Sequence, residues 1–332
     1  MKYKHLLVAV ALMITCCLAA CSGTDTGTDV NQVGPSSYPI EAYGNESEIM
    51  ELTEEMVPLA DAPTSVVLVP IASGNVVYQG NGVSIDASNT VDGYVMISYT
   101  GAQAMLKVII TGPSTTQYTY NLSTAGVYET FPLSDGNGTY KIGVYKNVSG
   151  TKYSVLFNRQ LTVTFKDEFA PFLRPNQYVN YTADSKTVAQ AKTIVTGKVT
   201  VLEKVEAVYD YVVKNLTYDK EKAKTVQSGY LPDVDAILAS KKGICFDYSA
   251  VMAAMLRSQG VPTKLVVGYA GTAYHAWINV YSEDTGWVEG AIFFDGTTWK
   301  LMDPTFASSG KSSNSVMEYI GDGSNYTVKY LY

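Results

Sequence analysis

The sequence predicts two folded parts, an antiparallel β-sandwich followed by an α+β domain. From about residue 64 to residue 165, runs of β-branched and aromatic residues alternate with Gly- and Asn-containing turns. After residue 169, apolar residues recur at steps of three and four, and strand-like alternation returns beyond residue 262. Short strands between turns are typical of an all-β sandwich. Helices followed by strands are typical of an α+β domain.

The first part is assigned to residues 63–168. Turn sequences at 80–82, 92–93 and 135–138 separate its candidate strands. This spacing favours an immunoglobulin-like or fibronectin-like module of about 100 residues. It carries no chemical motif, so we interpret it as a spacer or binding module. The predicted strands cover residues 66–69, 94–99, 106–111, 140–145 and 153–165.

The second part is assigned to residues 169–332. Its longest predicted helix, 244–259, is followed by Gly260 and Pro262, which end helices in this arrangement. The other predicted helices are 186–195, 201–216 and 233–239, and the predicted strands are 264–269, 274–281, 287–294 and 298–302.

The N-terminus has the features of a secretory signal. Lys2 and Lys4 precede an apolar run at 6–14 that is too short to span a bilayer, and residues 18–21 read Leu-Ala-Ala-Cys. This ending resembles the lipobox of bacterial lipoproteins. It implies removal of residues 1–20 and lipidation of Cys21, which would hold the chain at the bacterial cell membrane on its extracytoplasmic side. An ordinary signal peptide or a short uncut anchor are the alternatives.

Residues 21–62 are predicted to be a disordered acidic tether, because they contain acids but no Lys or Arg. The whole chain has a net charge of −7, and loss of Lys2 and Lys4 would make the mature chain more acidic still. A nucleic-acid partner would call for a basic patch, so we expect none.

Cysteine and histidine are scarce in the mature chain. Residues 1–20 hold two of the four cysteines and one of the two histidines. With Cys21 lipidated, Cys245 remains as the free thiol and His275 as the imidazole. These numbers argue against the common zinc sites and against a disulfide-stapled fold. We therefore predict neither a metal nor a cofactor.

Cys245 falls in the first turn of the longest predicted helix. Unpaired N–H groups and the helix dipole favour an anion there, and a thiolate is the reactive form of cysteine. The backbone N–H of Cys245 is a candidate oxyanion donor. Gly243 is expected to let the chain turn tightly before the helix. The alternative is a buried cysteine that acts as a small apolar side chain.

His275 and Asp303 supply candidate partners for this thiol. His275 lies on the strand 274–281, and Asp303 follows the strand 298–302. If these strands are neighbours, Asp303 can accept a hydrogen bond from one imidazole nitrogen while the other faces Cys245. A structural histidine and a turn aspartate are the alternatives. The conjunction of all three residues favours catalysis.

Five segments surround the three candidate residues: 243–249, 256–262, 267–269, 274–277 and 303–305. Together they resemble the transglutaminase-like superfamily. This resemblance implies a papain-like α+β core with Cys245 as nucleophile, His275 as base and Asp303 as the orienting residue. It also implies a second oxyanion donor upstream, for which Tyr230 is a candidate, and it makes Trp277 a candidate for lining the cleft.

The expected activity is acyl transfer through a Cys245 thioester, from an amide substrate to an amine or to water. The expected partners are extracellular proteins or peptides. A cysteine peptidase of the same fold is one alternative. A catalytically silent binding or structural lipoprotein is the other.

Overall fold

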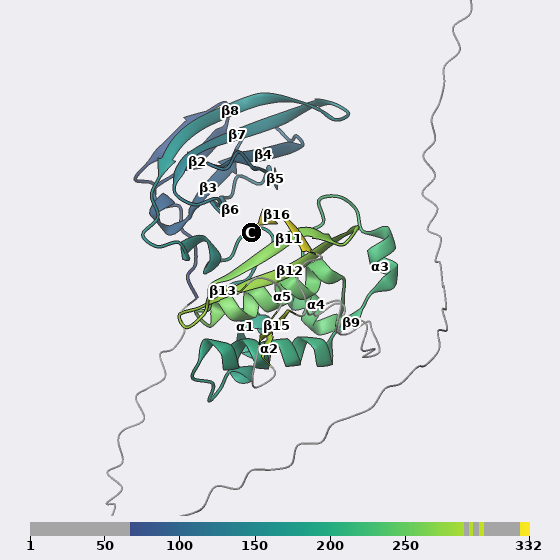
Figure 1. Cartoon of the computed structure of the whole chain (residues 1–332). Coiled ribbons are helices and arrows are strands. Elements are labelled where there is room, and N and C mark those ends of the chain that lie inside the picture. Colours follow the sequence, from purple (N-terminus) through teal and green to yellow (C-terminus); the bar gives the residue numbers. More distant parts are fainter. Residues whose placement is uncertain (1–66, 289–291, 295–298, 302–325) are drawn as a thin grey trace, which may run out of the picture. The chain divides into compact units, whose positions relative to one another are not determined.

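The computed structural model describes residues 67–288, 292–294, 299–301 and 326–332 (Figure 1). Its first part, which we call the β module (residues 77–163), contains two four-stranded antiparallel sheets. One sheet has the order β1 (Val77–Gly80), β2 (Val83–Asp86), β3 (Tyr94–Tyr99), β6 (Glu129–Pro132). The other has the order β5 (Gln117–Leu122), β4 (Leu106–Thr111), β7 (Gly138–Ser149), β8 (Lys152–Val163).

Alternating side chains explain how these sheets build a core. Leu106, Val108 and Ile110 of β4 are buried, whereas the residues between them are only partly covered. The two sheets meet through the rings of Tyr120 and Phe131, whose centroids lie 5.3 Å apart. The prediction of a strand at 66–69 differs from the structure. Residues 67–70 have no regular structure, and Leu68 and Val69 are exposed, so this apolar run adds nothing to a sheet.

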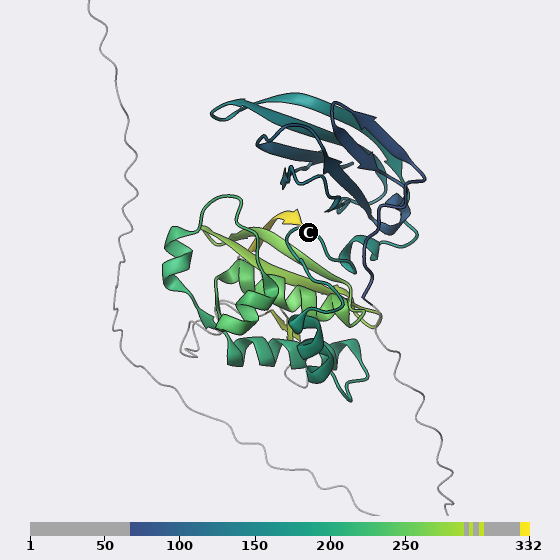
Figure 2. The same ribbon diagram turned by 180° about the vertical axis from the view of Figure 1, so that it is seen from behind.

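A central helix organises the second part. Helix α5 (Cys245–Ser258) is buried from Asp247 to Ser258. It packs on β11 (Thr263–Ala270) and β12 (Ala273–Ser282) and contacts three other helices; Figures 1 and 2 show it between this sheet and α2. The other helices are α1 (Lys186–Ile194), α2 (Val201–Asn215), α3 (Lys220–Thr225) and α4 (Val234–Ser240). Two 3-10 turns precede them in the chain, η1 (Thr90–Asp92) in the β module and η2 (Ala170–Phe172) just after it.

The strands of the second part form an antiparallel sheet in the order β13 (Gly286–Val288), β12, β11, β16 (Tyr326–Leu331). A parallel pair joins β9 (Thr217–Tyr218) to β10 (Lys242–Gly243). A separate antiparallel pair joins β14 (Ile292–Phe294) to β15 (Trp299–Leu301).

Two predictions about these strands need correction. The single strand at 287–294 is wrong, because β13 pairs with β12 whereas β14 belongs to a different sheet. The predicted pairing of the 298–302 strand with the histidine strand is also not seen among the described residues. There β15 pairs with β14, and β12 has β11 on one side and β13, at 280–282, on the other.

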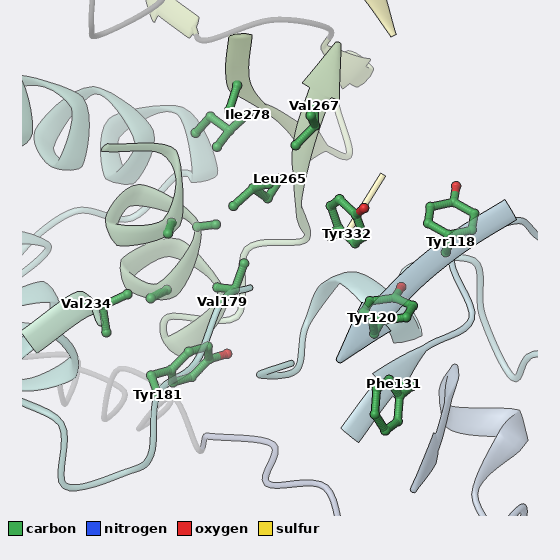
Figure 3. Packing of buried hydrophobic residues seen from close by; sticks show 14 of the residues in the cluster. Tyr118, Tyr120, Phe131, Val179, Tyr181, Val234, Leu265, Val267, Ile278 and Tyr332 are labelled. Carbon is green, nitrogen blue, oxygen red and sulfur yellow. The ribbon is translucent and has the colours of Figure 1, made fainter. Parts of the chain in front are cut away.

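The buried core runs without interruption from the β module into the second part. Figure 3 shows Tyr332 beside Tyr118 and Tyr120, and its ring lies 5.7 and 5.9 Å from theirs between centroids. Pairs of aromatic rings at these distances stabilise a contact beyond their buried area. Within the described part of the chain, no helix combines the length and apolarity needed to cross a membrane.

Candidate active site

Cys245 is the first residue of α5, which agrees with its predicted place in the first turn of this helix. Ile244 precedes it in an extended conformation and forms the N-cap. The Asp247 carboxylate accepts the Ile244 N–H at 2.8 Å, which satisfies one of the backbone donors that a helix start leaves open. Cys245 is a half-buried free thiol. The local structure therefore presents a thiol at the positive end of a long, buried helix.

Gly243 acts differently from the expectation of a tight turn. The left-handed residue before α5 is Lys241, with φ 53°, and Gly243 lies in β10. A Cβ atom on residue 243 would lie 2.6 Å from the Asp247 Cβ, closer than real Cβ contacts. The glycine is needed for close packing against Asp247.

Asp247 is the centre of a three-residue polar cluster, the Asp247–Lys222–Tyr230 cluster. The ammonium of Lys222 lies 2.6 Å from Asp247 Oδ2, and the Tyr230 hydroxyl donates to Oδ1 at 2.6 Å. Lys222 also donates to the Tyr230 oxygen at 2.7 Å. Burial and the hydrogen bond to Asp247 raise the pKa of Tyr230 well above its ordinary value. The cluster joins α3 and the following loop to the start of α5.

Cys245 and His275 line one cavity of about 510 Å³. His275 comes from β12, where it is buried and lies opposite Gly268 of β11. Because α5 packs directly on β12, the nucleophile and base candidates line the same cavity although 29 residues separate them along the chain. The other lining residues are Tyr178, Tyr218, Ala223, Val226, Gln227, Ser228, Gly229, Tyr230, Ile244, Phe246, Val267, Tyr274, Ala276 and Tyr332.

Tyr230 lines the same cavity as Cys245, but its hydroxyl donates to Asp247. To donate to an oxyanion, the Tyr230 hydroxyl would have to give up its hydrogen bond to Asp247. The role of Tyr230 as an oxyanion donor therefore stays a prediction. Trp277 differs from the expectation of a cleft-lining residue. It is 2% exposed and does not line this cavity, because its indole is packed against β11 near Gly268. Asp303 and Cys21 lie outside the described residues.

Three features of the site were missed from the sequence. Lys222 lies on α3, a six-residue helix without an apolar stripe, so periodicity could not reveal it. Tyr178 and Tyr332 reach the cavity from the segment before α1 and from the end of β16. The chain has 26 tyrosines, and no local sequence pattern distinguishes a tyrosine that lines a cavity from one on the surface. The sequence therefore could not single out these two. Among the described residues, no group of three or more His, Cys, Asp or Glu side chains could hold a metal ion.

Residues 188–290 match the model of the Transglutaminase-like superfamily. The chain carries a transglutaminase-like domain. That range contains both Cys245 and His275. The β module and Asp303 lie outside the matched range.

Known proteins resemble this chain in part. A protein of Bacillus subtilis (strain 168), described as the uncharacterized protein YebA, is 33% identical over 106 residues; the match covers 26% of this chain but only 14% of that protein. A Cytophaga hutchinsonii structure described as a candidate cysteine protease has 14% identity and a TM-score of 0.34, over 72% of this chain and 76% of that one. Red sea bream transglutaminase has 13% identity and a TM-score of 0.29, over 69% of this chain and 53% of that one.

Proposed function

We propose that the transglutaminase-like domain is a cysteine acyltransferase that uses Cys245 as nucleophile and His275 as base. The observation that carries this proposal is that the free thiol at the start of α5 and the imidazole on β12 line the same cavity. A nucleophile and a base that converge on one cavity, from rigid elements, are the arrangement that covalent catalysis needs.

The proposed reaction has two steps. The Cys245 thiolate attacks the carbonyl carbon of an amide, a C–S bond forms, and the C–N bond breaks as His275 gives its proton to the leaving amine. An amine or a water molecule then attacks the thioester carbon, passes a proton to His275 and releases the thiolate. The backbone N–H of Cys245 would stabilise the oxyanion in both steps. Asp303 would orient His275.

Labelling of Cys245 tests this proposal. We expect iodoacetamide to modify Cys245 faster than an unactivated thiol between pH 6 and pH 8, and we expect His275→Ala to abolish the difference. Site-specific modification can be followed on the peptide that contains Cys245. Equal rates for Cys245 and a model thiol, with no effect of His275→Ala, would rule out the enzyme and leave a silent binding or structural protein.

The second candidate function is a cysteine peptidase of the same fold, because the same nucleophile and base can pass the acyl group to water. Incubation with a glutamine-containing peptide and a labelled amine separates the two. Attachment of the amine to glutamine supports transfer, whereas cleavage of the peptide backbone supports proteolysis.

We also propose that the chain is a lipoprotein anchored through Cys21 on the outer side of a bacterial membrane, where its substrates would be extracellular proteins or peptides. The support is the basic, apolar and Leu-Ala-Ala-Cys pattern of residues 2–21. A Cys21→Ser variant should lose incorporation of a labelled fatty acid and leave the membrane fraction. Retention of both in the variant would contradict the anchor.

For the β module we propose an immunoglobulin-like or fibronectin-like sandwich. In support, Tyr140 near the start of β7 donates its hydroxyl to the Gly136 carbonyl at 2.7 Å and accepts the Asp135 N–H at 2.9 Å. A tyrosine that bonds backbone a few residues upstream in this way is a feature of such sandwiches.

A further inference from the structure

We propose that Lys222 is a positioning residue for Cys245: its ammonium offsets the buried Asp247 carboxylate at the start of α5, so that the thiolate can form there. This inference rests on the proposed function, because it concerns how the nucleophile is activated. It assigns a role to the Lys222–Asp247 ion pair, which the proposed reaction steps do not use.

The first turn of α5 contains a buried carboxylate, Asp247, close to the thiol of Cys245 in the sequence. Asp247 follows Cys245 by two residues and is 0% exposed. Its carboxylate holds the Ile244 N–H, so it lies at the same helix end that must carry a thiolate. Two negative charges at one site oppose each other, and a buried charge without a partner is costly. Without compensation, Asp247 would disfavour the anion that the reaction needs.

Lys222 supplies that compensation from a different element. Its Nζ lies 2.6 Å from Asp247 Oδ2, and its side chain is 27% exposed, so water screens the contact only partly. An ion pair at this distance has little net charge, which leaves the positive end of α5 to act on Cys245. Among the ion pairs of the described residues, the Lys222–Asp247 pair is the one whose carboxylate is fully buried.

The remaining titratable groups at this site do not replace the pair. His275 of β12 is the proposed base. Burial raises the pKa of Tyr178 to about 12 and raises the pKa values of Tyr230 and Tyr274, so these phenols stay neutral near pH 7. Besides Cys245, the side chains of the cavity wall and of the Asp247–Lys222–Tyr230 cluster that can carry charge near pH 7 are therefore His275, Lys222 and Asp247. The titratable side chains lining the cavity are Tyr178, Tyr218, Tyr230, Cys245, Tyr274, His275 and Tyr332.

A variant of Tyr230 distinguishes the effect of the Lys222 charge from the effect of the hydrogen bonds within the cluster. Its hydroxyl bonds both Asp247 and Lys222, yet it is neutral. Tyr230→Phe removes hydrogen bonds from the cluster without changing its charge. Lys222→Gln does the opposite, because it keeps a donor near Asp247 and removes the positive charge.

The experiment measures the rate of iodoacetamide modification of Cys245 from pH 5 to pH 10 in the full chain, read by mass spectrometry of the Cys245 peptide. We expect Lys222→Met and Lys222→Gln to move the midpoint of this profile upward by about one pH unit. Lys222→Arg should restore a midpoint close to that of the wild type. Tyr230→Phe should move it much less than Lys222→Gln.

Lys224→Met is the matched control, because Lys224 lies on the same helix and pairs with the exposed Glu221. It should leave the profile unchanged. Thermal unfolding of each variant shows whether it is folded. If Lys222→Met is not folded, the comparison rests on Lys222→Gln. An activated wild-type thiol with unchanged midpoints in the folded Lys222 variants overturns this inference alone. A wild-type thiol that is not activated, and is indifferent to His275→Ala, overturns the proposed function instead.

Discussion

Gly243 and Asp247 approach so closely that a Cβ atom on residue 243 would lie 2.6 Å from the Cβ atom of Asp247. The obstructing atom belongs to a fully buried side chain whose carboxylate is held by Ile244, Lys222 and Tyr230. Asp247 therefore cannot move aside without breaking the contacts that hold the start of α5.

Gly243→Ala should consequently lower the free energy of unfolding by about 1–3 kcal/mol, as overpacking of a dense interior does. It should also slow alkylation of Cys245, because the clash lies at the helix end that presents the thiol. Urea denaturation and iodoacetamide kinetics measure the two effects. Lys242→Ala, on the exposed neighbouring residue, should change neither. A Gly243→Ala protein as stable as the wild type would show that Asp247 has room to shift.

Arg257 should be among the most sensitive residues of α5. It is buried, and it donates to the carbonyls of Thr263 and Arg174 at 2.8 Å each and to that of Tyr332 at 2.5 Å. Burial lowers the pKa of its guanidinium to about 10. Arg257→Met leaves three carbonyls without this donor, so we expect a loss of about 3 kcal/mol or more in unfolding free energy.

Arg159→Met provides the comparison for Arg257. Arg159 is exposed on β8 and stacks on Tyr78 and Phe157, so its replacement should cost about 1 kcal/mol or less. Chemical denaturation of both variants gives the two values. Similar costs at the two positions would contradict the role assigned to Arg257.

Asp235 should make stability depend on pH. Partial burial acts to raise the pKa of this carboxyl, but hydrogen bonds from Thr187 and the Lys186 N–H outweigh it and hold the pKa below its ordinary value. A group with a depressed folded pKa stabilises the protein above the unfolded pKa of about 4, and this stabilisation disappears as pH falls through the folded value.

Asp235→Asn should therefore cost about 1 kcal/mol at pH 7, and the difference from the wild type should shrink below about pH 4. Urea denaturation at pH 7, 5 and 3 measures this trend. Asp184→Asn is the control, because Asp184 is an exposed aspartate just before α1, the helix whose first N–H groups Asp235 accepts. A cost for Asp235→Asn that does not vary with pH would show that the carboxylate charge is irrelevant.

Tyr140→Phe tests the connection between β7 and the turn before it. The hydroxyl that this change removes bonds Gly136 and Asp135, and burial raises the pKa of Tyr140 far above its ordinary value. Loss of both hydrogen bonds at a buried position should lower the unfolding free energy by about 1–2 kcal/mol. Tyr145→Phe, on the same strand but only partly buried, should cost less. Calorimetry of the two variants compares them, and an equal cost would argue against the hydroxyl of Tyr140 as the cause.

Much of the site could be predicted because its signals are local. The position of Cys245 at the start of α5 follows from the long apolar periodicity of this helix, and the strand that carries His275 follows from simple alternation. Both patterns are read over a few neighbouring residues. Local patterns failed for the apolar run at 67–69 and for the interrupted strand at 287–294. A β-rich composition does not determine which segment pairs with a neighbouring strand.

By itself, the sequence determined where the thiol and the imidazole lie within their secondary-structure elements. It also determined the order of the β module and the transglutaminase-like domain. Only the tertiary structure decided that Lys222 and Tyr230 close around Asp247, that Trp277 is buried away from the cavity, and that Tyr178 and Tyr332 complete the cavity wall. The physical reason is distance along the chain. Helix and strand periods arise from neighbouring residues, whereas these contacts form between elements far apart in sequence, as the whole core packs.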